Sequence, residues 1–210
     1  MGICLCFWKN KDAYFFIYAQ NLTVSSITGI VEVDETYIGG KEIGTGKQGR
    51  GAEDKFLVVV ATECIGKMIG SVRFKIIPDA SGENLIPFIE ENVEHQSTII
   101  TDGWSGYASL SKREDYHYVE KVISGSGKKA HELLPHVHMV NSLVKRWING
   151  THQGKMSPKY LEYYLDEFAF RFNRKLSNHR GKLFYRLIQQ AVNTLPVTYD
   201  EMIKQLALSG

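Results

Sequence analysis

The order in which hydrophobic periodicity changes along this chain of 210 residues is the feature that most constrains its fold. Side chains of a strand alternate between two faces, whereas the apolar residues of an amphipathic helix recur every three or four positions. By these patterns the chain begins with three strands and continues with a helix, a strand, a short helix and a further strand. The segments are, in turn, 29–38, 55–64, 70–77, 83–93, 97–102, 103–110 and 116–123.

Beyond Pro135 the patterns are helical. Ser157 and Pro158 are typical of an N-cap and a first helical turn, and they begin the second of these helices. The predicted helices are 134–152, 157–175, 180–193 and 199–209.

This order of elements is that of an RNase H-like fold. We therefore expect an α/β structure in which a mixed sheet is flanked by helices, with a helical C-terminal extension. The expected organisation is a leader at 1–27, one domain at 28–190 and a helical tail at 191–210.

Charge is distributed unevenly, although the formal net charge is only +2. Residues 141–190 hold ten Lys and Arg against Glu162, Asp166 and Glu167. A basic half of this kind is typical of proteins with a polyanionic partner, and the alternative is a solvated helix face. The 43% hydrophobic content is enough for a sizeable core, so we expect a soluble globular protein.

The three cysteines, Cys4, Cys6 and Cys64, lack the paired spacing of a zinc knuckle and are odd in number. They therefore indicate neither a disulfide framework nor a zinc knuckle, and a reducing compartment is expected. Lys9 and Lys11 interrupt the apolar N-terminus before a signal sequence or membrane span could form.

Asp34 and Asp102 occupy positions that this fold would bring together. In "GIVEVDETYIGGK", the apolar residues of the strand point to one face, and Glu32 and Asp34 point to the other. Asp102 follows a buried type of strand, where Gly103 lets the chain turn, and these two strands are neighbours in an RNase H-like sheet. Facing carboxylates repel unless protons or cations intervene, and hard oxygen ligands suit Mg²⁺ or Mn²⁺. Taken singly, each has a plainer explanation: a solvated edge strand for Asp34 and a helix N-cap for Asp102.

The helix at 134–152 offers a third ligand. His138, Asn141 or Ser142, and Lys145 lie one and two turns apart on a single face. That helix has no Asp or Glu, so it offers no third carboxylate. A lone helical His is more often a packed or exposed residue, and only its place among the aspartates singles out His138.

Five motifs occur in order at compatible spacing: "VEVDETYIGGK", "TDGWSGY", the helix with Lys145, "GTHQG" and "YLDEFAFRFNRK". In this combination the chain resembles the ISXO-like transposase domain of bacterial insertion sequences. That family is a branch of the DDE transposases with an RNase H-like fold and kinship to the eukaryotic Merlin elements. The resemblance spans about residues 28–190; each motif alone would be weak, but the combination is specific.

The resemblance implies that Asp34 and Asp102 are the first two catalytic aspartates. Lys145 matches a lysine that follows the third catalytic position by seven residues, which places His138 where many relatives have Glu. The implied metal ligands are therefore Asp34, Asp102 and His138, and Asn141 is the alternative third ligand. Imidazole is a poorer ligand than carboxylate for Mg²⁺ and suits Mn²⁺ better.

The family's chemistry is cleavage of the transposon end by water, followed by attack of the freed 3′-hydroxyl on target DNA, with two metal ions expected. The implied partner is double-stranded DNA, both element ends and target, and an oligomer would join two ends. No membrane is implied, and the location is the cytoplasm, at the nucleoid. Lys145 would contact a phosphate near the scissile bond. The expected DNA-binding residues are Lys145, Arg146, Trp147, Arg171, Asn173, Arg174 and Lys175.

Other residues near the motifs have structural explanations. Trp104 and Tyr107 could stack on an unpaired base, but packing beneath the site is the expectation. Glu35 alternates to the opposite face from Asp34, and Glu167 lies on a later helix, so neither is expected to be a ligand. The aromatic stripe of the helix at 157–175 is expected in the core.

The N-terminal region departs from the family. Relatives normally place a zinc-binding ribbon and a helix-turn-helix ahead of the first aspartate, whereas residues 1–27 hold Cys4 and Cys6 without such a pattern. We therefore expect an incomplete transposase that retains its catalytic domain. The rival interpretations are an RNase H-like nuclease or resolvase and a non-catalytic DNA-binding relic.

Overall fold

The computed structural model describes residues 2–3, 17–18, 26–39, 55–122, 130–152, 161–179, 181–182 and 185. The chain divides into two compact units. One comprises residues 25–158, and the other comprises residues 1–24 together with 159–210.

The first unit is built on a five-stranded mixed sheet with the strand order β5-β4-β3-β6-β7. The central strand β3 pairs antiparallel with β4 along its whole length and parallel with β6, and β6 in turn pairs parallel with β7. The strands are β3 (Ile30–Gly39), β4 (Lys55–Ile65), β5 (Met68–Ile77), β6 (Thr98–Thr101) and β7 (His117–Glu120).

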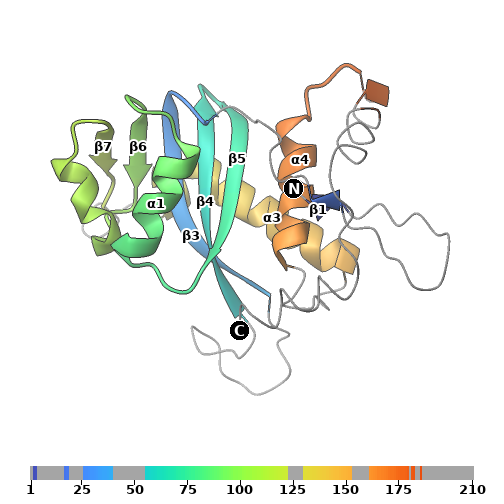
Figure 1. Ribbon diagram of the computed structural model, residues 1–210, viewed down its shortest axis with the longest axis horizontal. Helices are drawn as coiled ribbons and strands as arrows, with labels where there is room; N and C mark the ends of the chain where they lie inside the picture. The colour runs from blue at the N-terminus through green and yellow to red at the C-terminus, as the bar shows by residue number, and fades with distance from the viewer. Residues whose placement is uncertain are drawn as a thin grey trace. The chain divides into compact units, whose positions relative to one another are not determined.

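Helices cover both faces of this sheet (Figure 1). Helix α1 (Gly82–Asn92) lies on one face together with the 3-10 helix η1 (Ser105–Lys112), and α3 (Pro135–His152) crosses the other face behind β3 and β4. The short helix α2 (Ala130–Leu133) leads into α3.

The main core lies between the sheet and α1. Val31 and Val33 of β3 are fully buried there with Leu85, Phe88 and Ile89 of α1. Burying such side chains removes apolar surface from water, which is the dominant favourable term in folding. Because the apolar residues of β3 face α1, its intervening acidic residues face α3.

The strand order and directions are those of the RNase H-like fold, as the sequence predicted. The strands β3 to β7 and the helices α1, η1, α3 and α4 lie within a few residues of their expected bounds, whereas β1, β2 and α2 were not expected. The explanation of Asp34 as a solvated residue of an edge strand is wrong, because β3 is the central strand and Glu32 and Asp34 are only 3% and 9% exposed.

The second unit contains helix α4 (Leu161–Asn173) and a two-stranded antiparallel pairing of β1 (Gly2–Ile3) with β2 (Ile17–Tyr18). The α4 side chains Leu165, Phe168 and Phe170 are buried, in agreement with the expectation of a core stripe. The helix predicted at 199–209 lies outside the described residues, as do all but three residues of the one at 180–193.

The expected boundaries at residues 28 and 190 stay a prediction. In the described part of the chain, none of the helices has an apolar stretch long enough to cross a membrane.

Candidate active site

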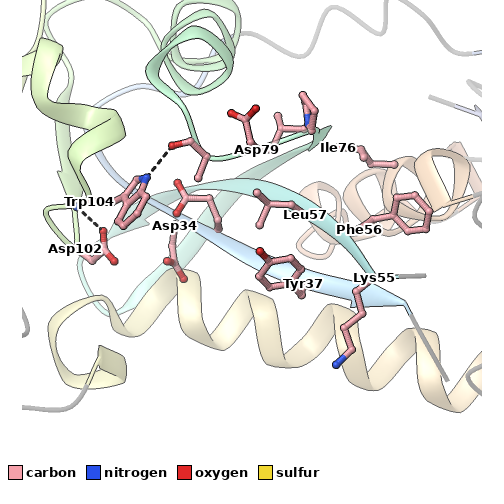
Figure 2. A pocket seen from close by; sticks show the side chains of 13 residues that line it. Asp34, Tyr37, Lys55, Phe56, Leu57, Ile76, Asp79, Asp102 and Trp104 are labelled. Carbon is pink, nitrogen blue, oxygen red and sulfur yellow. Dashed lines mark hydrogen bonds between the residues drawn. The ribbon is translucent and has the colours of Figure 1, made fainter. Parts of the chain in front are cut away.

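Asp34 and Asp102 lie where two parallel strands part. The pairing of β3 with β6 ends at Glu32 opposite Ile100, and each aspartate stands two residues further along its own strand. Both carboxylates line a pocket of about 680 Å³. Figure 2 shows Asp102 beside Trp104 at one end of this pocket, with Asp34 next to them.

The turn after β6 fixes the position of Asp102. Gly103 adopts φ +81°, a left-handed conformation that glycine takes at little cost, so the chain can turn as soon as the strand ends. Asp102 Oδ1 accepts a hydrogen bond of 3.0 Å from the backbone N–H of Trp104. One carboxylate oxygen thus holds the turn, and the other remains available in the pocket.

Helix α3 brings two candidate ligands to Asp34. Asn141 Nδ2 donates a hydrogen bond of 3.0 Å to Asp34 Oδ2, and Nδ1 of His138 lies 3.8 Å from the same oxygen. His138 and Asn141 are one turn apart, so the helical spacing read from the sequence does put both against the first aspartate.

The pKa of Asp34 is raised to about 6. Burial is the main cause, and the charge of Asp102 raises the pKa further, while His138 and, more weakly, Lys145 act in the opposite direction. A buried carboxylate with a second acid nearby is stabilised by a cation in the pocket. The electrostatics therefore suit a site that holds a positive charge.

The side-chain oxygen of Asn141 is the observation that bears on whether a hard cation suits this site. Its side chain is buried, yet Oδ1 has no hydrogen-bond partner, although nearly all buried polar atoms have one. An amide oxygen and carboxylate oxygens form the donor set that Mg²⁺ and Mn²⁺ prefer. Asp34, Asp102 and Asn141 supply oxygens of this kind, and it is Nδ2 of Asn141 that faces Asp34 when no ion is present.

The predicted set of Asp34, Asp102 and His138 is not the most closely spaced group of ligands. In the part of the chain that the structure describes, one group of three metal-ligating side chains has all its ligand atoms within 4.8 Å of one another. That group is Glu32, Cys64 and His136.

The predicted DNA-binding residues fall on two units. Lys145 of α3 is close enough for Asp34 to raise its pKa, but partial burial, the larger effect, lowers that pKa. Arg146 is exposed, and Trp147 is partly buried.

Three of the predicted DNA-binding residues on α4 or directly after it contact side chains of that helix. Arg171 pairs with Glu167 at 2.7 Å, and the Arg174 guanidinium lies 4.0 Å from the centre of the Phe170 ring. Lys175 Nζ lies 4.1 Å from the centre of the Phe172 ring. Asn173 is the last residue of the helix. Their contact with DNA stays a prediction.

Glu35 was not expected at the site, yet it lines the same pocket as both aspartates. It does alternate to the other face of β3, where it accepts a hydrogen bond from the buried hydroxyl of Tyr107 in η1. Burial raises its pKa to about 7, and the charges of Asp34 and Asp102 act in the same direction. The pairing of β3 with β6 ends at Glu32, so beyond that residue side chains from both faces of β3 can line the pocket.

Glu32 was also missed as a functional residue. Its Oε2 accepts hydrogen bonds of 2.8 Å from the backbone N–H groups of His136 and Val137, the first free donors of α3. Its Oε1 lies 2.9 Å from His136 Nδ1. A buried carboxylate on the central strand therefore caps α3 from 105 residues away and sets where that helix begins beside Asp34.

The rest of the pocket is partly aromatic. Trp104 and Tyr37 are 47% and 42% exposed, and Figure 2 shows Tyr37 beyond Asp34, with Lys55 and Phe56 at the far end. Trp104 Nε1 donates a hydrogen bond of 2.7 Å to the carbonyl of Ala80, so the indole is held in place with one side open. Tyr107 is fully buried, which confirms packing for that residue alone.

Comparison with known proteins agrees with the motifs. The model of the ISXO2-like transposase domain matches residues 26–173. Among solved structures, the crystal structure of the catalytic core domain of BIV integrase is similar, with a TM-score of 0.45 and 14% sequence identity over 70% of this chain and 85% of that chain. None of the curated proteins matches this chain. Since the family model spans most of the chain, the protein belongs to the ISXO2-like transposase domain family.

Proposed function

We propose that this chain is the catalytic domain of a transposase that cleaves DNA at insertion-sequence ends and joins the freed end to target DNA. The observation that carries the proposal is that Asp34 and Asp102 line one pocket, while the α3 side chains Asn141 and His138 lie against Asp34. Family membership supports a nucleotidyl-transfer reaction at this pocket.

Asp34, Asp102 and Asn141 would hold Mg²⁺ or Mn²⁺ in this reaction. A bound divalent ion lowers the pKa of an attacking water and stabilises charge on the leaving oxygen. The chain's own part is to position these donors: β3 carries Asp34, the turn at Gly103 carries Asp102, and α3 brings Asn141 against Asp34. Lys145 lies close enough to the site to bind a phosphate of the DNA as a point charge.

For the third ligand we favour Asn141 over His138. Asn141 contacts Asp34 directly, it is buried, and its oxygen has no partner. His138 is 28% exposed and further from Asp34, and its nitrogen suits Mn²⁺ better than Mg²⁺. The two assignments predict different metal preferences.

The remaining assignments follow from the same reaction. We propose that the partner is double-stranded DNA. The residues that contact it are Arg146 and Trp147 of α3, Arg171 and Asn173 of α4, and Arg174 and Lys175 directly after α4. Two element ends have to be joined, so the active form is an oligomer, and its place is the cytoplasm at the nucleoid.

The test is cleavage and strand transfer by the purified chain on labelled duplexes that carry the ends of the neighbouring element. Wild type is compared with Asp102→Asn, Asn141→Ala and His138→Ala in Mg²⁺ and in Mn²⁺. We expect joining by wild type, loss in Asp102→Asn and Asn141→Ala, and retention of DNA binding by all variants. Circular dichroism of each variant controls for folding.

The outcomes separate the rival functions. Metal-dependent cutting of any duplex without end-specific joining would indicate a nuclease or resolvase. DNA binding without cutting in either metal would indicate a non-catalytic relic. Loss of activity with His138→Ala but not with Asn141→Ala would move the third ligand to His138.

A further inference from the structure

A second group of metal-ligating side chains lies on the α3 face of the sheet. Glu32, Cys64 and His136 each present one ligand atom, and these atoms all lie within 4.8 Å of one another. They come from three elements: the start of β3, the end of β4 and the first turn of α3. The group has a thiol and an imidazole, so its chemistry differs from that of the aspartate pocket.

Regular alternation along β4 brings Cys64 to this group. Thr62 lies opposite Glu32 in the ladder with β3, and Cys64, two residues further on, lies opposite Ile30 on the same face of the sheet. The pairing of β4 with β5 shifts register between Thr62 and Cys64, and the extra residue lies in β5.

Both ring nitrogens of His136 face an acceptor oxygen. Nε2 lies 3.1 Å from the carbonyl oxygen of Gly66, and Nδ1 lies 2.9 Å from Glu32 Oε1. A hydrogen on Nε2 would leave a lone pair of Nδ1 toward Glu32, which is the arrangement of a metal-ligating histidine whose other ring N–H is held by a carbonyl oxygen.

Thr62 provides an independent observation beside the group. It stands directly opposite Glu32 in the β3–β4 register, so the two side chains share a face of the sheet. Thr62 is fully buried, and its Oγ1 has no hydrogen-bond partner. Buried hydroxyls are almost always satisfied, so an unpaired one adjacent to three ligand atoms points to a ligand or its bound water.

The thiol of Cys64 is protonated when no metal is bound. Burial, and then the charge of Glu32, raises its pKa to about 12, and Sγ donates a weak hydrogen bond of 3.6 Å to the carbonyl of Thr62. A divalent ion would displace this proton to solvent, because the thiolate is the ligand. Glu32 and the thiolate together then balance the charge of the ion, so the positive end of α3 does not oppose its binding.

We propose that Glu32 Oε1, Cys64 Sγ and His136 Nδ1 bind a divalent transition-metal ion of the Zn²⁺ class. Thiolate and imidazole select such an ion over Mg²⁺, so this site is separate from the catalytic cation. The ion joins the first turn of α3 to β3 and β4, while Glu32 Oε2 still caps the helix. The proposal does not depend on transposase activity.

The experiment uses the full chain titrated with Co²⁺ as a spectroscopic substitute for Zn²⁺. We expect a thiolate-to-cobalt absorption band in the near ultraviolet, and its loss when Zn²⁺ is added in excess. Cys64→Ser should abolish the band and weaken Zn²⁺ binding, measured by equilibrium dialysis, by about tenfold or more. The Cys4→Ser/Cys6→Ser double variant should keep both the cobalt absorption band and the affinity for Zn²⁺.

Two further measurements separate this site from its alternatives. Asp34→Asn/Asp102→Asn should retain the cobalt band, and Zn²⁺ should raise the melting temperature of wild type but not of Cys64→Ser. A band that survives Cys64→Ser, or that disappears with the N-terminal cysteines, would overturn the proposal. So would the absence of Zn²⁺ binding to the wild-type chain.

Discussion

Tyr107 donates a hydrogen bond from its buried hydroxyl to Glu35, and this bond ties the segment after Asp102 to the strand that carries Asp34. No strand pairing does so at this level, because β3 and β6 pair only as far as Glu32 and Ile100. The hydrogen bond therefore positions the two aspartates across the gap between their strands.

Tyr107→Phe should destabilise the protein by about 1–3 kcal/mol, because a buried acceptor loses its partner. The free energy of unfolding is measured in urea at fixed pH. The phenyl ring retains the packing of Tyr107, so the loss reports the hydroxyl alone. A variant as stable as wild type would show that the hydrogen bond contributes no net stability.

Glu35 should make the metal-free protein less stable as pH rises. Its pKa is raised from 4.5 to about 7 in the folded protein, chiefly by burial, so the folded state holds a proton that the unfolded state has released. Its stabilising effect is complete below pH 4.5 and is lost as pH rises through about 7, at a cost on the order of 3 kcal/mol. Urea denaturation from pH 4.5 to 8 in EDTA measures the slope.

Glu35→Gln is the matched control for this pH dependence. The amide oxygen keeps an acceptor for Tyr107 but does not titrate, so the variant should lose most of the decline in stability between pH 4.5 and 7. A decline of the same size in Glu35→Gln would assign the titration to Asp34, whose pKa is also raised.

Glu32→Ala should loosen the first turn of α3. It removes a buried carboxylate that accepts hydrogen bonds from two backbone N–H groups, and we expect a loss of about 2–4 kcal/mol. Hydrogen exchange should show reduced protection at the amides of His136 and Val137 in particular. Glu114→Ala, at an exposed position, should stay within about 0.5 kcal/mol of wild type. Uniform loss of protection across the sheet would instead indicate general destabilisation without a specific cap.

Asn141→Asp should tighten Mg²⁺ binding at the active site. A carboxylate in place of the amide adds a charged oxygen ligand against Asp34, and we expect the Kd for Mg²⁺, measured by calorimetry, to fall about tenfold. Ser142→Asp adds the same charge at the next, exposed position and should change the Kd little. Equal effects of the two substitutions would argue for long-range attraction and against coordination.

Trp104→Ala should weaken binding of single-stranded DNA by about 1–3 kcal/mol, because the half-exposed indole offers a stacking surface at the pocket. Fluorescence of a base analogue placed along the strand measures the stacking. Trp104→Phe keeps an aromatic face but loses the hydrogen bond to Ala80, so its affinity should be intermediate. Unchanged affinity in Trp104→Ala would assign Trp104 to packing.

The sequence predicts that Asp34 and Asp102 lie near each other, because the position of each aspartate on its strand follows from local sequence patterns. Alternation along 29–38 separates Asp34 from the apolar face, and the apolar run before Asp102 ends at a glycine that turns the chain. The order of elements then makes their strands neighbours. The helical spacing of His138 and Asn141 is also local, but which one reaches Asp34 depends on how far α3 is advanced along the strand.

The contacts of Glu32 and Glu35 could not be predicted in this way. Glu32 bonds to residues more than 100 positions away, and no local pattern shows that a strand carboxylate will cap a distant helix. Glu35 does lie on the opposite face of β3 from Asp34, as predicted, but it still lines the same pocket. This is because the β3–β6 pairing ends before Asp34 and opens the pocket to both faces of β3. Where a sheet stops pairing is a property of three-dimensional packing.

β3 and β6 pair no further than Glu32 and Ile100. Beyond this point Asp34 stays paired with β4, opposite Val60, and β6 pairs with β7 as far as Thr101, the residue before Asp102. Side-chain contacts and the turn at Gly103, and not a shared ladder of backbone hydrogen bonds, therefore set the separation of the two carboxylates. A substitution at one of these contacts can change that separation while the sheet itself stays intact.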